Sequence, residues 1–432
     1  MLARLSFPLL VLLICAGIVC AQPSAPLAVP LEGEAFAATL AGIDSQQNLK
    51  WKVGNKLRVM PAGDLVSWGA WKDVETGPQI LLADGGILRA DVLKLDANHL
   101  VIGDAADLGS VLWGESALPV EAVAGVLWQP PADPLARDRL RAKLLQLPAG
   151  DDQLLLIGGE TLSGALLDVP LAGRFAEDAR LTTAGEVFQL QTPRSEKPLV
   201  IAASKVLAFR LGAATVSQPV AGRAFARLGF RDGSFVVAQG FAMKGDATHV
   251  QLSAGVQVLA NNAFGDGSAG WFWSQISLVQ PVSKRVVYVS DLKPLGYKHL
   301  PFLSGEWSYG TDQNVLGGQL RTRDQVHSKG LGMFPASRLA YQLDGQYRKL
   351  QGSLAIDAQA AAKGSVVLRV LTENDQGQWS TAYESPVIRG NEPPVEFSVD
   401  VRQAQRMALL VDFADRGDEC DYANWLDLRL LK

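Results

Sequence analysis

The chain has 432 residues, of which 48% are hydrophobic and 19% charged, and a formal net charge of −4. This length exceeds one ordinary hydrophobic core and predicts about two to four domains, and the apolar content excludes a disordered chain. Acidic and basic residues are interspersed, which argues against a nucleic-acid partner and against binding to an anionic membrane surface.

Residues 1–21 have the pattern of a cleaved secretory signal. Arg4 precedes an apolar stretch over 9–19, which is shorter than the about 20 residues that a membrane-spanning helix needs. A retained anchor and a lipoprotein at Cys20 are the alternatives. We expect a secreted or periplasmic protein with no membrane span after signal cleavage. Cleavage leaves Cys420 as the one cysteine, so no intramolecular disulfide is expected.

Residues 32–288 contain a weak internal repeat. Each copy opens with two apolar runs around a Gly-Gly or Asp-Gly turn and closes on a strand rich in Ala and Val. The openings lie at 81–88, 154–161 and 228–235, and the closings at 120–127, 200–207 and 279–287. Val126, Val206 and Val286 are 80 residues apart in each step, and a shorter copy covers 33–68. The repeat predicts tandem small β-meander or barrel-like units, two over 32–130 and two over 150–285.

A helical connector is predicted over 131–149, between the second and third units. Asp133 can cap its start, and Pro134 suits the first helical position. An apolar stripe lies opposite a basic face. The stripe contains Leu135, Leu140, Leu144, Leu145 and Leu147, and the basic face contains Arg137, Arg139, Arg141 and Lys143. A helix on a membrane surface is the alternative, which Asp133 and Asp138 disfavour by diluting the positive charge.

The carboxy-terminal third alternates between apolar and polar residues with the period of a β-strand. The alternating segments lie at 349–356, 366–371, 395–401 and 407–413. Several antiparallel strands joined by polar loops are typical of a β-sandwich. The sequence therefore predicts an all-β chain, with the tandem units followed by a sandwich.

Ordered motifs in this third resemble the NPCBM family, the carbohydrate-binding modules associated with family 98 glycoside hydrolases. The motifs are Val-Ser-Asp-Leu at 289–292, His-Ser-Lys-Gly-Leu-Gly at 327–332, Leu-Ala-Tyr-Gln-Leu at 339–343, Gly-Ser-Val-Val-Leu-Arg-Val at 364–370 and Asp-Tyr-Ala-Asn-Trp-Leu-Asp at 421–427. The resemblance covers 286–432. It implies a jelly-roll, galactose-binding-like β-sandwich whose loops bind a glycan at one end.

Sugar recognition combines flat aromatic faces with planar polar groups, and the module has both. The residues that we predict to bind carbohydrate are Trp307, His327, Lys329, Asp421, Asn424, Trp425 and Asp427. Several alternatives stay open. Trp425 begins a final strand and suits a core position, the segment 327–332 suits a sharp backbone turn, and Asp421 and Asp427 can fix loops by accepting hydrogen bonds from backbone N–H groups.

The sequence departs from the family pattern in its best motifs. Phe334 stands where related modules usually have a histidine, and Tyr422 and Asn424 replace the more usual histidine and aspartate. The identity of the sugar therefore does not carry over from the family.

An acidic run near the end of the chain suggests a structural calcium ion. Asp415, Asp418 and Asp421 are the predicted ligands, because carboxylate oxygens are what calcium prefers. The spacing differs from that of an EF-hand, and a solvated acidic loop is the alternative. No other cofactor is expected.

The sequence contains none of the common catalytic motifs, and its four histidines, at 99, 249, 299 and 327, lie in separate segments. We therefore expect a non-catalytic glycan-binding protein with no identified protein partner. One alternative is an envelope structural or interaction protein that has lost sugar binding, and another is a cryptic glycoside hydrolase. If Trp307, Trp379 and Trp425 are exposed, glycan binding is favoured, and if all are buried, the envelope role is favoured. Two acidic side chains about 5–10 Å apart in a cleft would favour the hydrolase.

Overall fold

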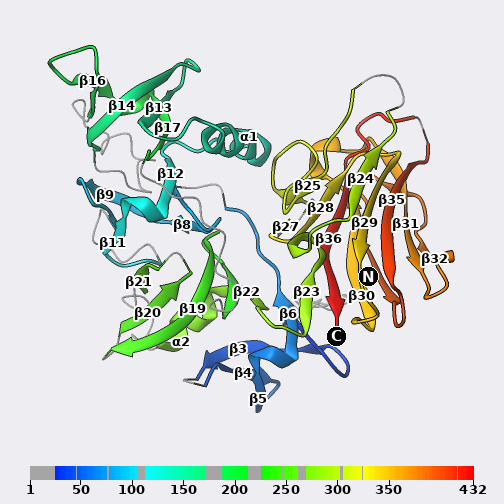
Figure 1. The fold of residues 1–432 in the computed structure, drawn as a ribbon. Helices are drawn as coiled ribbons and strands as arrows, with labels where there is room; N and C mark the ends of the chain where they lie inside the picture. The colour runs from blue at the N-terminus through cyan, green and yellow to red at the C-terminus, as the bar shows by residue number, and fades with distance from the viewer. Residues whose placement is uncertain are drawn as a thin grey trace, which may run out of the picture.

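The structure is a computed structural model that describes residues 25–44, 46–74, 77–104, 112–170, 187–212, 225–244, 247–253, 255–260, 269–301, 305–323, 325–415 and 417–432. The predicted signal over 1–21 lies outside the described residues. Strands dominate and form two bodies, the tandem units and a carboxy-terminal sandwich (Figure 1). The predicted all-β fold class is confirmed. In the described part of the chain, no helix is long and apolar enough to cross a membrane.

Each tandem unit has four consecutive antiparallel strands, a helical turn, and a last strand that returns beside the first. The first unit contains β1 (Leu27–Pro30), β2 (Phe36–Ala37), β3 (Thr39–Ile43), β4 (Asn48–Val53), β5 (Lys56–Pro61), η1 (Ala62–Asp64) and β6 (Leu65–Gly69). The second contains β7 (Gln79–Leu82), β8 (Ile87–Arg89), β9 (Asp91–Leu95), β10 (His99–Gly103), β11 (Ser116–Pro119), η2 (Val120–Ala122) and β12 (Val123–Leu127). In these two units the second strand is broken into two pieces, β2 and β3 in the first unit and β8 and β9 in the second.

The third and fourth units have an unbroken second strand. The third contains β13 (Asp152–Leu156), β14 (Thr161–Asp168), β15 (Val187–Gln191), β16 (Leu199–Ala202), η3 (Ala203–Lys205) and β17 (Val206–Arg210). The fourth contains β18 (Ala226–Phe230), β19 (Phe235–Lys244), β20 (Ala247–Leu252), β21 (Gln257–Ala260), α2 (Ala269–Gln275) and β22 (Ile276–Pro281). In the fourth unit, α2 takes the place of the short helical turn.

The hairpin turns that open the later three units form at the glycines expected from the sequence. Gly85, Gly159 and Gly233 have φ angles of 86°, 87° and 88°. A positive φ of this size strains residues with a side chain, which is why glycine occupies the same place in each unit.

The three valines spaced 80 residues apart do not lie at equivalent positions in the structure. Val126 is the fourth residue of β12 and pairs with Phe209, the fourth residue of β17. Val206 is instead the first residue of β17, and Val286 begins β23 (Val286–Tyr288), which pairs with the sandwich strand β36 (Ala423–Leu431). The three valines therefore occupy different positions in their strands, and the 80-residue spacing does not mark equivalent sites.

The units are joined by pairing between their strands. β12 pairs with β17, β6 pairs with β22, and β8 meets β19 at a single pair, so the first strands and the returning strands form one continuous path. β1 begins at Leu27, ahead of the predicted start at residue 32. The division into units over 32–130 and 150–285 and a module over 286–432 stays a prediction.

Helix α1 (Pro134–Leu145) lies between the tandem units and the sandwich (Figure 1). The side chain of Asp133 accepts a hydrogen bond from the backbone N–H of Ala136 at 2.8 Å, so the predicted cap is present. Leu140 and Leu144 pack with residues of β12 and β17. On the opposite side, Asp138 contacts Arg321 of the sandwich and Arg137 is buried, whereas Arg139 and Lys143 are exposed.

The sandwich consists of two six-stranded sheets packed face to face. One sheet contains β23, β25 (Gly310–Thr311), β28 (Gly330–Met333), β30 (Lys349–Ile356), β34 (Val395–Asp400) and β36. The other contains β24 (Gly296–His299), β29 (Ser337–Gln342), β31 (Ser365–Glu373), β32 (Trp379–Glu384), β33 (Ile388–Arg389) and β35 (Arg406–Phe413). A separate hairpin joins β26 (Leu320–Arg321) to β27 (Val326–His327), and the turns η4 (Val289–Asp291) and η5 (Ala358–Ala360) complete the module. Leu350, Leu354, Leu368 and Leu409 are among the core residues between the sheets.

Candidate functional site

An exposed tryptophan lies in the loop between β24 and β25. The ring of Trp307 is 39% exposed and stacks on Phe334, with 4.8 Å between ring centroids and 12° between planes. The Tyr297 hydroxyl donates to the carbonyl of Trp307 at 2.7 Å, and the backbone N–H of Trp307 donates to Nδ1 of His299 at 3.2 Å. The ring and the backbone of Trp307 are therefore both held in place while the side chain stays partly exposed.

Two further rings extend this aromatic surface. The centroids of His299 and Tyr422 each lie 6.1 Å from that of Phe334. We call Trp307, Phe334, His299 and Tyr422 the aromatic patch. Phe334 and Tyr422 are two of the departures from the family pattern, and the structure brings them together. Because Nδ1 of His299 accepts a hydrogen bond, the neutral ring carries its hydrogen on Nε2, which can donate to a hydroxyl.

His327 and Asp427, both predicted to bind sugar, lie where the sandwich meets the fourth unit. Nδ1 of His327 and Oδ2 of Asp427 are 2.7 Å apart, and the Gln280 side chain donates to Oδ1 of Asp427 at 2.9 Å. Burial would raise the pKa of Asp427, but the charge and hydrogen bond of His327 outweigh it and lower the pKa. Asp427 has a φ of 48°, where the register between β30 and β36 shifts. The pair ties β27, β36 and β22 together.

Lys329 and Asn424 face inward as well. Nζ of Lys329 donates to Asp291 at 2.6 Å and to Asp312 at 2.5 Å, which neutralises its charge within the protein. The Asn424 side chain is fully buried and donates to Asp357 at 2.7 Å. Both residues hold the loops that surround β28 and β36.

Trp425 does not form a binding platform in this structure. Its ring is 0% exposed, belongs to the sandwich core and meets Phe397 edge-on with 6.0 Å between centroids. The core alternative for Trp425 is the arrangement that the structure shows. Trp379, on β32, is 44% exposed and lies under the guanidinium of Arg406.

Asp421 is also buried and fixes a loop. Its Oδ1 accepts a hydrogen bond from the backbone N–H of Ser365 at 2.6 Å, as in the loop-fixing alternative. Burial raises the pKa of Asp421 to about 6 despite that hydrogen bond.

The predicted calcium ligands do not converge. Asp415 pairs with Arg389 at 2.7 Å, while Asp421 faces Ser365. Among the residues that the structure describes, no three His, Cys, Asp or Glu side chains are arranged to hold a metal ion. The structure corrects this prediction because each of these two carboxylates has a protein donor of its own.

A buried charge network that the sequence analysis missed joins the sandwich to α1. Arg321 of the β26–β27 hairpin donates to Asp138 at 3.1 Å and to Asp73 at 3.0 Å, and Arg137 donates to Asp73 at 2.7 Å. Burial raises the pKa of Asp138, although Arg321 and Arg141 oppose it. Arg137 was expected on an open basic face, but it is 1% exposed. The acid within that basic face, Asp138, was the one available signal for a buried partner.

Comparison with known proteins finds a family match in the carboxy-terminal third of the chain. The family model "NPCBM/NEW2 domain" matches residues 285–431. The chain is similar to the CBM51-2 and INT domains from Clostridium perfringens ZmpB, at 28% identity over 34% of this chain and 31% of that chain, with a TM-score of 0.30. No curated protein matches the chain.

Two other solved modules match the chain with lower sequence identity and almost the same TM-score. CBM51 from Clostridium perfringens GH95 in complex with methyl-galactose is 19% identical over 34% of this chain and 99% of that chain, with a TM-score of 0.29. The tandem CBM51 modules of Sp3GH98, the family 98 glycoside hydrolase from Streptococcus pneumoniae, are 22% identical over 34% of this chain and 47% of that chain, with a TM-score of 0.29. The carboxy-terminal third of the chain, residues 285–431, therefore matches the NPCBM/NEW2 domain, and in this structure it is a β-sandwich.

Proposed function

We propose that this protein is exported and binds glycans without catalysis, through the aromatic patch of its NPCBM/NEW2 domain. The observation that carries the proposal is Trp307, an exposed tryptophan whose ring and backbone are both held in place. A tryptophan face covers the apolar C–H side of a sugar ring, and one that is already ordered loses little conformational entropy on binding.

The patch also supplies a polar group beside its aromatic face. His299 accepts from the backbone of Trp307 through Nδ1, so its Nε2 is available to donate to a sugar hydroxyl. The four patch residues include no pair of carboxylates, the arrangement that glycoside hydrolysis uses. We assign His327, Lys329, Asn424 and Asp427 to positioning, because each side chain is held by at least one hydrogen bond or ion pair within the protein.

The proposal is tested on a glycan array with the full chain, in calcium and in chelator. Trp307→Ala is the test variant, and Trp379→Ala, which removes the other strongly exposed tryptophan of the module, is the matched control. We expect the wild type and Trp379→Ala to bind the same glycans, and Trp307→Ala to bind at least about tenfold more weakly, since stacked aromatics dominate such sites. Chelation should change nothing.

Two results would contradict the proposal. The first is no binding to any glycan by the folded wild type, which would favour the structural role in the envelope. The second is a binding loss confined to Trp379→Ala, which would move the site to β32.

A further inference from the structure

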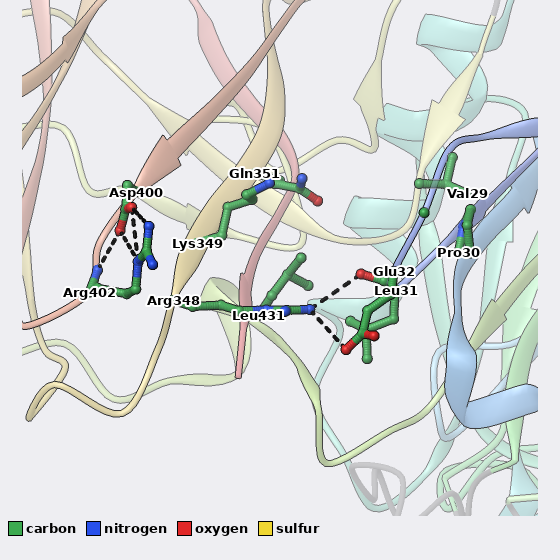
Figure 2. Close-up of a pocket in the computed structure, with 11 residues that line it drawn as sticks. Val29, Pro30, Leu31, Glu32, Arg348, Lys349, Gln351, Asp400, Arg402 and Leu431 are labelled. Atoms are coloured by element: carbon green, nitrogen blue, oxygen red, sulfur yellow. Dashed lines mark hydrogen bonds and ion pairs between the residues drawn. The ribbon is translucent and has the colours of Figure 1, made fainter.

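A second concave surface lies between the first tandem unit and the sandwich, at residues that none of the motifs covers. It has a volume of about 550 Å³, within the range of about 300–1,000 Å³ typical of ligand pockets. One wall is the segment that follows β1, including Glu32. The other wall is formed by the start of β30 and the end of β34, including Lys349 and Arg402 (Figure 2). We call this surface the charged groove.

The floor of the charged groove is apolar and tightly packed. Leu31 and Leu431 line it and belong to a buried cluster with Val66 and Val286, so the tandem unit and the sandwich share this core. The two walls therefore have a fixed separation, as a preorganised site requires.

The rim includes several planar hydrogen-bonding side chains. Arg348 reaches across the groove, donates to the carbonyl of Leu31 at 3.3 Å and lies 3.8 Å from the carboxylate of Glu32 (Figure 2). Arg402 donates to Asp400 at 2.9 Å on the facing edge, and Gln351 extends from β30. Guanidinium, carboxylate and amide groups pair with adjacent hydroxyls of a sugar, while the apolar floor suits its C–H face.

The charges of the rim do not cancel. Glu32 is paired with Arg348 and Arg285, and Asp400 is paired with Arg402. Lys349 is exposed, and its charge acts on Asp400 together with that of Arg402, so the lining has three cations against two carboxylates. This excess of one positive charge at the rim would attract an anionic substituent of a ligand, and the exposed ammonium of Lys349 is placed to meet it.

We infer that the charged groove is a second binding site, for an oligosaccharide that carries carboxylates, such as a chain of hexuronate residues. The sugar rings lie on the Leu31 and Leu431 floor, Arg348 and Arg402 bond the hydroxyls, and Lys349 pairs with a carboxylate. The first unit supplies one wall, so the complete site exists only in the full chain. This site is separate from the aromatic patch and does not depend on it.

The test is calorimetric titration of the full chain with tri-galacturonate, and with neutral galactotriose as the uncharged counterpart. We expect tri-galacturonate to bind and galactotriose to bind more weakly. Added salt should weaken tri-galacturonate binding, because exposed charges are screened. Lys349→Ala and Arg402→Ala should each weaken tri-galacturonate binding by about tenfold, the value of one charge-assisted contact.

Each test variant has a control in the same sandwich. Lys363→Ala removes another exposed lysine, and Arg389→Ala removes an exposed arginine from an Asp pair like that of Arg402. Both controls should bind as the wild type does. Trp307→Ala should also keep tri-galacturonate binding, which separates this site from the patch.

Three results would overturn the inference. They are no binding of tri-galacturonate by the folded wild type, equal binding of both trisaccharides, and wild-type affinity in both Lys349→Ala and Arg402→Ala. General attraction to a polyanion is not expected, because the chain has a formal net charge of −4.

Discussion

The free end of the sandwich and the face that it packs against the tandem units differ in how they use family residues. The free end presents Trp307 on Phe334, beside Tyr422, with the tryptophan side chain partly exposed. The covered face places His327 and Asp427 against Gln280, and Arg321 against Asp138 of α1. The motif residues of this covered face bond within the protein, whereas the open surface contains residues that depart from the family.

This difference teaches that a motif can mark a shared architecture rather than a binding surface. The histidine and aspartate of the covered face stabilise a strained bulge and a contact between domains. Phe334 and Tyr422, two of the departures from the family pattern, lie together on the open surface. Disrupting each region in turn separates the two roles.

The largest effect is expected for Arg321→Ala, which breaks the covered face. It leaves Asp73 and Asp138 with one buried cation fewer, and removing one partner of a buried ion pair costs about 3–5 kcal/mol. Urea unfolding, monitored by tryptophan fluorescence, should show this loss of free energy as a lower midpoint of the first unfolding transition. Arg323→Ala, an exposed arginine beside it, should change that transition by less than about 0.5 kcal/mol. Equal effects of the two variants would mean that the buried network does not hold the domains together.

Trp425→Ala sharpens the contrast between core and surface within one domain. Its side chain is fully buried, so truncation leaves a cavity and should reduce the free energy of unfolding by about 3–5 kcal/mol. Trp379→Ala, at an exposed position, should cost less than about 1 kcal/mol in the same unfolding assay. A Trp425→Ala protein as stable as the wild type would place this ring outside the core.

Local signals explain what the sequence could predict. Strand alternation, the glycine turns at 85, 159 and 233, and the Asp133 cap each depend on residues close together in the chain, and all are present. The order of the family motifs along the chain predicted the carboxy-terminal sandwich. These features need no knowledge of tertiary contacts.

What the sequence could not predict depends on partners that are far apart in the chain. Arg321 meets Asp138 across 183 positions, so part of the polar side of α1 is buried against the sandwich. Asp427 lies where the register of β36 shifts, and such a shift alters which neighbouring side chains face the core. Trp307 and Trp425 have the same chemistry, and only the packing decides that one is exposed and the other buried.

Asp421, buried against the backbone of Ser365, allows a smaller, pH-dependent test. Burial raises its pKa from the ordinary value of 3.8 to about 6 in the folded protein. Between these values the folded state holds a proton that the unfolded state has lost, so stability should fall as the pH rises from about 4 to about 6, by about 1–3 kcal/mol. Asp421→Asn cannot ionise and should lose this part of the pH dependence. Asp415→Asn, at the exposed partner of Arg389, should retain it. Urea midpoints of the three proteins across this pH range measure the effect. Parallel profiles for the wild type and Asp421→Asn would show that Asp421 is ionised at low cost and that its loop is more open than the hydrogen bond to Ser365 implies.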